Sequence, residues 1–142
     1  MSFDLRIEGN DLKINPDGSI QTVRDNQKLI QDIIKALLTP IGNNKFFLWY
    51  GSSLPANIIG QVLDSNFITS EAERSIQNTL SQIISLQNAQ SKVQYVSAGE
   101  MIAAIRSVTV LRSNIDPRQF EITVSVLTRK LNVVEETFTL TV

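Results

Sequence analysis

Cysteine and histidine are both absent from this chain of 142 residues. Without cysteine there can be no disulfide framework, no thiolate nucleophile and no cysteine-bound zinc or iron–sulfur site. The lack of histidine excludes serine–histidine triads, imidazole bases and histidine-bound metals. Carboxylates, lysine, tyrosine and the hydroxyl residues are the groups that remain for chemistry. We therefore expect no metal site and no cofactor.

An excess of charge of either sign and long apolar runs are lacking too. Thirteen Lys and Arg balance fourteen Asp and Glu, for a net charge of −1. Such balance gives no bulk attraction for a polyanion, so we expect no nucleic-acid partner. No stretch approaches the ~20 apolar residues of a membrane span, and no apolar segment of a signal peptide follows the first residues. We expect no membrane partner and a chain that is made and kept in a cytoplasm.

Apolar residues and side-chain amides are plentiful instead. Apolar residues make up 42% of the chain, and eleven Asn and ten Gln accompany 27 charged side chains. Amides form hydrogen bonds without setting up long-range fields, which is compatible with packing against other proteins. The length suits one domain over residues 1–142. We divide it into N-terminal strands or an arm over 1–24, a helical part over 25–90 and a β part over 103–142.

Helical periodicity dominates the middle of the chain. Between Asp25, which we place at the N-cap, and Pro40, apolar residues recur at the spacing of one helix face. A short helical turn follows over 54–59. Residues 70–73 (Ser-Glu-Ala-Glu) match a capping box and predict the start of a second amphipathic helix that ends near Asn88.

An aromatic segment lies between these helices at residues 43–50 and includes Phe46, Phe47 and Trp49. Such a density of large apolar side chains, with turn formers on both sides, favours a plug that closes one end of the core. An exposed docking patch for another protein is the alternative. Both interpretations place the segment near a contact surface.

Strand patterns dominate the last forty residues. Residues 105–127 read as a hairpin with one buried face, and the turn is at 114–117. The alternation over 137–142 reaches the last residue, so this strand must pair, within its own sheet or with another chain. The fold class is α+β, with a small, mostly antiparallel sheet packed against two main helices. The helix at 26–38 and the hairpin should form the core.

Paired carboxylates are the strongest catalytic device left to this composition. Glu71 and Glu73 are accounted for by helix capping, and the adjacent Glu135 and Glu136 point in opposite directions along a strand. Glu100 has no partner nearby in sequence. We therefore expect no catalytic residues, no small-molecule substrate and no enzyme. A carboxylate-dependent, lysozyme-like glycosidase remains as an alternative.

The run at 23–42, which ends in Leu-Leu-Thr-Pro-Ile-Gly, and the Tyr-Gly-Ser-Ser-Leu at 50–54 resemble a known family. They are similar to the baseplate wedge and sheath-initiator family of contractile phage tails, the lysozyme-like GPW type, to which a type VI secretion baseplate component is related. Residues 97–102 before the hairpin also resemble some members. The matching motif residues are Leu38, Thr39, Pro40, Gly42, Tyr50, Gly51 and Leu54.

This resemblance implies a non-enzymatic adaptor, present in six copies in a virion tail baseplate that is assembled in the bacterial host cytoplasm. Implied partners are other wedge proteins and the sheath protein, with tube or hub proteins as further candidates. In the family, sheath subunits are linked by strands exchanged into a neighbour's sheet, so an initiator must offer an equivalent edge. We expect residues 134–142 to form or flank that edge. Its pairing residues would be Thr137, Phe138, Thr139, Leu140, Thr141 and Val142.

One departure from the family pattern concerns a Glu-Pro-Arg motif that many members carry and that helps to hold neighbouring baseplate subunits. This chain lacks it. Residues 116–118 (Asp-Pro-Arg) are chemically close but fall in the turn between two strands, so that role is not transferred. A stand-alone protein-binding module, unrelated to phage, is the second alternative.

Overall fold

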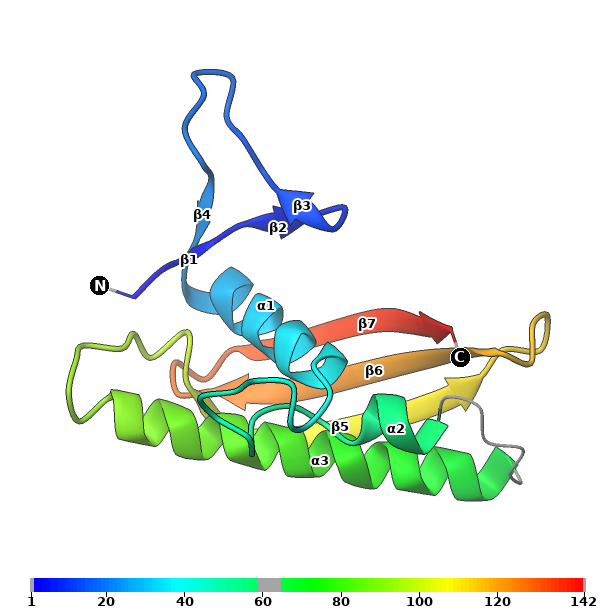
Figure 1. Cartoon of the computed structure of the whole chain (residues 1–142). Coiled ribbons are helices and arrows are strands. Elements are labelled where there is room, and N and C mark those ends of the chain that lie inside the picture. The colour runs from blue at the N-terminus through cyan, green and yellow to red at the C-terminus, as the bar shows by residue number, and fades with distance from the viewer. Residues whose placement is uncertain (1, 59–64, 142) are drawn as a thin grey trace.

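The computed structural model describes residues 2–58 and 65–141 and confirms the α+β fold class. Within these ranges, helices and a three-stranded antiparallel sheet form the body, and a slender β arm rises from it (Figure 1). The helices are α1 (Asp25–Leu38), α2 (Leu54–Ile58) and α3 (Ser65–Gln90). The strands of the body are β5 (Ile102–Arg112), β6 (Gln119–Thr128) and β7 (Val133–Thr141).

Short strands build the arm, which occupies residues 2–24. β1 (Asp4–Leu5) pairs with β4 (Thr22–Val23), and β2 (Ile7–Glu8) pairs with β3 (Asp11–Leu12), all antiparallel. A bridge between Ile14 and Ile20 continues the ribbon toward its tip. The sequence left open whether this segment forms strands or an arm, and it forms both.

Helix α1 follows the predicted periodicity, and its inner face buries Leu29, Ile33 and Leu37. The prediction that Asp25 is the N-cap is wrong. The N-cap is Arg24, and Asp25 has a φ of +50°. Its carboxylate instead accepts a hydrogen bond from the Ser97 hydroxyl, 72 residues along the chain. A tertiary contact thus takes the group that would otherwise cap the helix.

Helix α3 begins earlier than the capping box predicted. Ser70 lies inside the helix, five residues after its start at Ser65, so the predicted start is wrong. The reason is that Ile68, four residues before the buried Ala72, already belongs to the apolar stripe. The rest of the stripe is as predicted, with buried Ala72, Ile76, Leu80 and Ile83.

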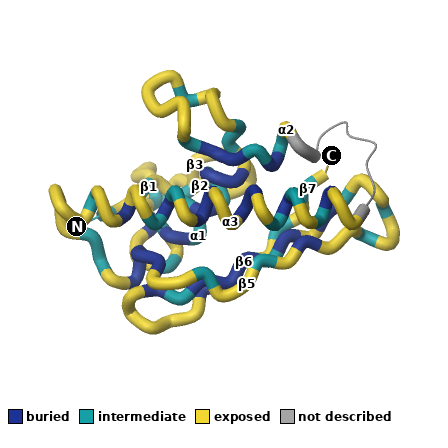
Figure 2. Tube along the Cα trace, turned by 90° about the horizontal axis from the view of Figure 1, so that it is seen from below, coloured by how far each residue is buried: buried dark blue, intermediate teal, exposed yellow. Residues whose placement is uncertain are grey.

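Strand β6 lies at the centre of the body sheet, in the order β5-β6-β7, and both of its ladders are antiparallel. Alternate residues of β6 are buried against the helices: Phe120, Ile122, Val124 and Val126. Figure 2 shows buried residues along β6 beside the largely exposed β5. The predicted core of first helix and hairpin is confirmed, and α3 adds its whole stripe to it.

A buried amide ties α3 to the start of β5. Gln87 Nε2 donates to the carbonyl of Glu100 at 2.7 Å, and Gln87 Oε1 accepts from the N–H of Ile102 at 2.8 Å. The Gln87 side chain is only 7% exposed. Its two hydrogen bonds therefore take the place of the water that the Glu100 carbonyl and the Ile102 N–H lose on folding.

Gln87→Leu tests this clamp. Leucine has a similar size but leaves a buried carbonyl and a buried N–H unpaired, which we expect to lower the free energy of unfolding by about 2–4 kcal/mol. Urea unfolding followed by circular dichroism measures the change. Gln77→Leu on the exposed face of the same helix is the control and should shift stability by less than about 0.5 kcal/mol. Equal losses in the two variants would contradict the clamp.

Candidate interaction surfaces

The two halves of the family-like motif meet in space at the end of α1. Pro40 and Ser52 form a parallel bridge. The Ser52 N–H donates to the Thr39 carbonyl at 2.8 Å, and the Ile41 N–H donates to the Ser52 carbonyl at 3.2 Å. Ser52 Oγ also donates to the Leu37 carbonyl at 2.7 Å. These bonds close the segment between Thr39 and Ser52 into a loop with fixed ends.

Glycine is required at position 51 of this closure. Gly51 has a φ of +117°, and a Cβ there would lie 2.4 Å from the carbonyl oxygen of Thr39. Gly42 has a φ of +90° but nothing within 4 Å of the equivalent position. After the closure, the buried Leu54 enters the core, whereas Leu38 on the other side of α1 is half exposed. The structure thus brings the two motif segments together, and their role in it is to close the loop between Thr39 and Ser52.

The aromatic tip of this loop does not plug the core. Phe46 is 91% exposed, Phe47 54% and Trp49 47%, so the plug interpretation is wrong. The tip is folded on itself: Asn44 Oδ1 accepts from the N–H groups of Phe46 and Phe47, which turns the chain outward. Of the aromatic residues in this segment, Tyr50 packs against the core.

Trp49 connects this tip to the second half of α3. Its ring meets the rings of Phe47 and Tyr50 edge-on, at centroid distances of 5.8 and 6.4 Å. It also lines a hollow of about 470 Å³ with Leu86 and Ala89 of α3. A neighbouring hollow of about 540 Å³ shares Leu86 and extends to Val93. We call the resulting face the aromatic surface; it consists of Phe46, Phe47, Trp49, Leu86, Ala89 and Val93.

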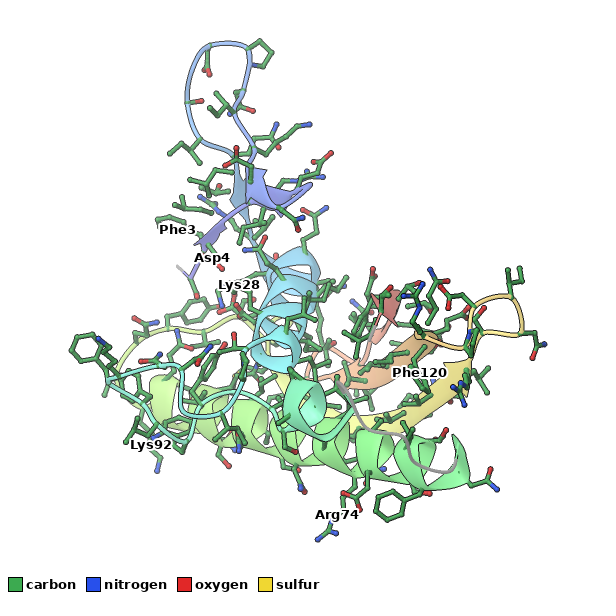
Figure 3. All side chains as sticks on the ribbon, turned by 45° about the vertical axis from the view of Figure 1, so that its right-hand side comes forward. Phe3, Asp4, Lys28, Arg74, Lys92 and Phe120 are labelled. Carbon is green, nitrogen blue, oxygen red and sulfur yellow. The ribbon has the colours of Figure 1, made fainter. Side chains whose placement is uncertain are left out.

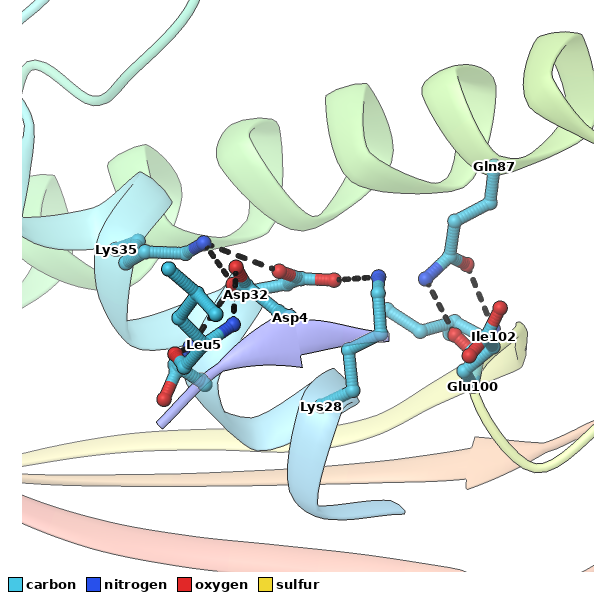
Figure 4. A network of polar contacts seen from close by, with 9 residues as sticks. Asp4, Leu5, Lys28, Asp32, Lys35, Gln87, Glu100 and Ile102 are labelled. Atoms are coloured by element: carbon cyan, nitrogen blue, oxygen red, sulfur yellow. Dashed lines mark hydrogen bonds and ion pairs between the residues drawn. The ribbon is translucent and has the colours of Figure 1, made fainter. Parts of the chain in front are cut away.

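A polar network holds the base of the arm on α1 (Figure 4). Lys35 forms an ion pair with Asp4 of β1 and a second one, at 3.5 Å, with Asp32. Asp32 also pairs with Lys28 at 2.6 Å. Gln31 completes the network, because its amide donates to Asp4 and to the Leu5 carbonyl and accepts from the Ile7 N–H.

Partial burial disfavours the charged forms of Asp4 and Lys35. Their hydrogen bonds and the opposite charges beside them have the larger combined effect. For Asp4, burial favours the neutral form, yet hydrogen bonds from Lys35 and Gln31 and the charge of Lys35 lower the pKa of the carboxyl. Burial likewise disfavours the Lys35 cation, and the bond to Asp4 with the charges of Asp32 and Asp4 raises its pKa. Burial raises the pKa of Tyr50, an effect that Lys35 reduces. The Asp4–Lys35 ion pair therefore keeps both of its charges at neutral pH.

Strand β7 leaves one edge free in the described part of the chain. Residues Val133–Thr141 pair with β6 without a register shift, from Val133 opposite Leu127 to Thr141 opposite Gln119. The other outer strand, β5, has two register shifts, at 102–104 and 105–107. Bulges twist an edge and hinder strand addition, so β7 is the better edge of the two. Of the predicted pairing residues, 137–141 lie on it, and Val142 lies outside the described residues.

A groove reaches β7 at Glu136. It has a volume of about 610 Å³ and is bounded by the arm, the outer face of α1 and Glu136 of β7. Its apolar floor comes from Ile30, Ile34 and Leu38 of α1. An extended segment that pairs with β7 near Glu136 would therefore lie close to these apolar side chains.

The carboxylates considered for catalysis do not face one another across a cleft among the described residues. Glu100 is 2% exposed and belongs to the turn beneath Gln87, and its Oε1 has no hydrogen-bond partner. Glu71 and Glu73 lie within α3, where Glu71 is 3.9 Å from Arg74. The described part of the chain holds no group of three or more acidic side chains placed to bind a metal ion. None of its helices has the length and apolarity to span a membrane.

Sequence reasoning missed the arm anchor and the Gln87 clamp. Both join residues far apart in the chain, such as Asp4 and Lys35, and neither lies in a recognisable motif. One usable indication existed: Gln87 is a polar residue at a buried position of the predicted helix stripe, where a partner is needed.

Comparison with solved structures identifies a similar fold. A crystal structure described as a "putative tail lysozyme" from Geobacter sulfurreducens aligns with a TM-score of 0.59 and 10% sequence identity. The alignment covers 82% of this chain and 89% of that chain, so most elements of the two folds correspond. No family model and no curated protein sequence matches this chain.

Gly51→Ala tests the loop closure. The added Cβ must displace the Thr39 carbonyl, so we expect a loss of more than about 2 kcal/mol in unfolding free energy, visible as a lower Tm. Gly42→Ala also has a positive φ but open space, and should cost only about 1 kcal/mol. The difference between the two losses measures the clash of the added Cβ with the Thr39 carbonyl. Equal losses in the two variants would show that this clash is absent.

Asp4→Asn tests the arm anchor. This partly exposed pair should contribute about 0.5–1 kcal/mol, so amide exchange at Arg6 and Ile7 should accelerate roughly two- to fivefold. Asp17→Asn at the arm tip is the control and should leave these amides unchanged.

The same exchange should depend on pH in the native protein after correction for the intrinsic rate. Asp4 has a lowered pKa, so its contribution is present above its ordinary value of 3.8 and is lost as the pH falls through the lowered value. Lys35 has a raised pKa, so its contribution is complete below 10.5 and is lost only above that. Protection of the arm should therefore be flat near neutrality and fall in acid. A loss of protection confined to neutral pH would contradict the assignment.

Proposed function

We propose that this chain is a non-enzymatic structural component of a contractile-tail baseplate, and that it initiates the sheath by accepting a strand. The observation that carries the proposal is the edge of β7, which is unbulged and free among the described residues and which meets a partly apolar groove at Glu136. Backbone hydrogen bonds along such an edge supply affinity, and alternate side chains set the register of the added strand.

Two further facts support a tail-related role. The fold is similar to that of a protein described as a putative tail lysozyme. The motif segments at 38–42 and 50–54, which suggested the baseplate wedge and sheath-initiator family, form one closed structural unit. Partners would be wedge proteins and the sheath protein, with tube or hub proteins next, in a virion tail baseplate assembled in the host cytoplasm. Six copies per assembly fit this role.

The placement of the carboxylates argues for a structural role over glycoside hydrolysis. A hydrolase needs two carboxyl groups on either side of the scissile bond, one of them held protonated. Asp4 and Asp32 line the same hollow, but both bind Lys35, and the pKa of Asp4 is lowered. Asp4 is therefore not suited to act as a general acid, and Asp32 is taken up by ion pairs with both Lys28 and Lys35. Wall-degrading activity that is lost in Glu100→Gln would contradict this part of the proposal.

Proline substitutions at Glu135 and Glu136 test strand acceptance. Along β7, the N–H groups of two neighbouring residues point to opposite sides, one toward β6 and one toward the free edge. Proline at the residue whose N–H points toward β6 removes a hydrogen bond between the two strands. This variant should lose about 1–3 kcal/mol of unfolding free energy. Proline at the residue whose N–H points toward the free edge should leave the fold intact. It removes a donor that an added strand needs, so it should block strand addition. Thermal unfolding identifies which variant is which.

The readout is binding to a contractile-tail sheath protein, measured by co-purification and by electron microscopy of initiated sheath. The stable proline variant should fail to bind and to initiate. Point substitutions are preferable to truncation, because residues 137–141 pair with β6 and their removal would also disturb the sheet. Full binding by the stable variant would place the sheath contact elsewhere. A chain that binds neither sheath nor wedge proteins would favour a stand-alone binding module.

A further inference from the structure

The arm carries two apolar cross-strand pairs that the described chain leaves about half exposed. Ile7 lies directly opposite Leu12, and Ile14 lies opposite Ile20, so each pair shares one face of the ribbon. All four side chains are between 41% and 61% exposed. A two-stranded ribbon without a packed face is only marginally stable in water. The arm therefore needs a partner surface.

The charges of the arm indicate the sign of that partner. Glu8 is already paired, with Arg6 and with Lys13, each at 3.3 Å. Asp11 and Asp17 remain as acidic groups near the two turns of the ribbon, and no ion pair joins either to a cation in the described residues. Asp17 is held ionised, because hydrogen bonds from Ser19 lower its pKa. The surface that covers the arm should be apolar and basic.

The same chain carries a surface of that kind. The aromatic surface exposes Phe46, Phe47, Trp49 and Val93. Lys45 precedes Phe46, and Lys92 precedes Val93, and neither lysine forms an ion pair with the described residues. The segments 41–50 and 78–96 contain no acidic residue. Two lysines and an aromatic hollow thus complement two aspartates and an aliphatic ribbon.

Within one chain these two surfaces do not meet. The Asp4–Lys35 anchor fixes the base of the arm on α1, and its tip points away from the body (Figure 1). Lys92 lies on the body below the arm (Figure 3). We propose that the arm of one copy docks on the aromatic surface of a second copy. Because the two patches differ, the contact is head-to-tail and can close into a ring.

A mixing experiment with the full chain tests this assembly. The arm variant carries Asp11→Lys and Asp17→Lys, and the surface variant carries Lys45→Glu and Lys92→Glu. Sedimentation velocity over a concentration series should show self-association of the unmodified protein, and each variant alone should associate roughly tenfold more weakly. An equimolar mixture should recover association, because reversed arms meet reversed surfaces.

A matched control changes as much charge elsewhere. Arg106→Glu with Lys130→Glu alters two exposed cations outside the aromatic surface and should leave self-association unchanged. Ile14→Ser removes apolar area from the arm without changing its charge, so this variant should also associate more weakly. Its mixture with the arm variant should stay weak, because neither chain then has an intact arm. The proposal is overturned if the unmodified chain stays monomeric at all concentrations, or if the mixture associates no better than the single variants. Neither outcome bears on sheath binding by β7, so the two proposals fail separately.

Discussion

Burial of the inner face of β6 is the constraint on which the rest of the structure depends. Phe120, Ile122, Val124 and Val126 meet both long helices, and β6 holds β5 on one side and β7 on the other. A sheet of three strands with one covered face has two edges by necessity. The edge used for any further pairing is then decided by local features, the bulges of β5 and the even register of β7.

Around this core the chain places its exposed apolar groups on separate elements. Polar or backbone contacts attach these elements to the body. Asp4 with Lys35 holds the arm, and Thr39 with Ser52 closes the loop that carries the aromatic tip. Many of their apolar side chains, such as Ile14 and Phe46, stay exposed because the attachment does not use them. This division suits a protein that gains much of its buried area on assembly, since each surface is ordered before a partner arrives.

The fold followed from local pattern wherever burial repeats along an element. The strands of the body and the stripe from Ala72 to Ile83 are regular enough to be predicted from spacing alone. The failures have a common physical origin. Asp25 bonds to Ser97, and the aromatic tip turns outward on Asn44, so distant or purely local polar contacts overrode the expected cap and plug. Of the candidate surfaces, the sequence indicated the last strand and missed the arm anchor.

The closure between Thr39 and Ser52 has a consequence for how this protein can diverge. It makes residues 40–51 a compact surface loop whose two ends are held side by side by backbone bonds. Such a loop can change length and sequence at its tip at a small cost in closure entropy, as long as glycine stays at position 51. The tip is thus an exchangeable module, in which relatives can acquire different side chains while the core beneath remains the same.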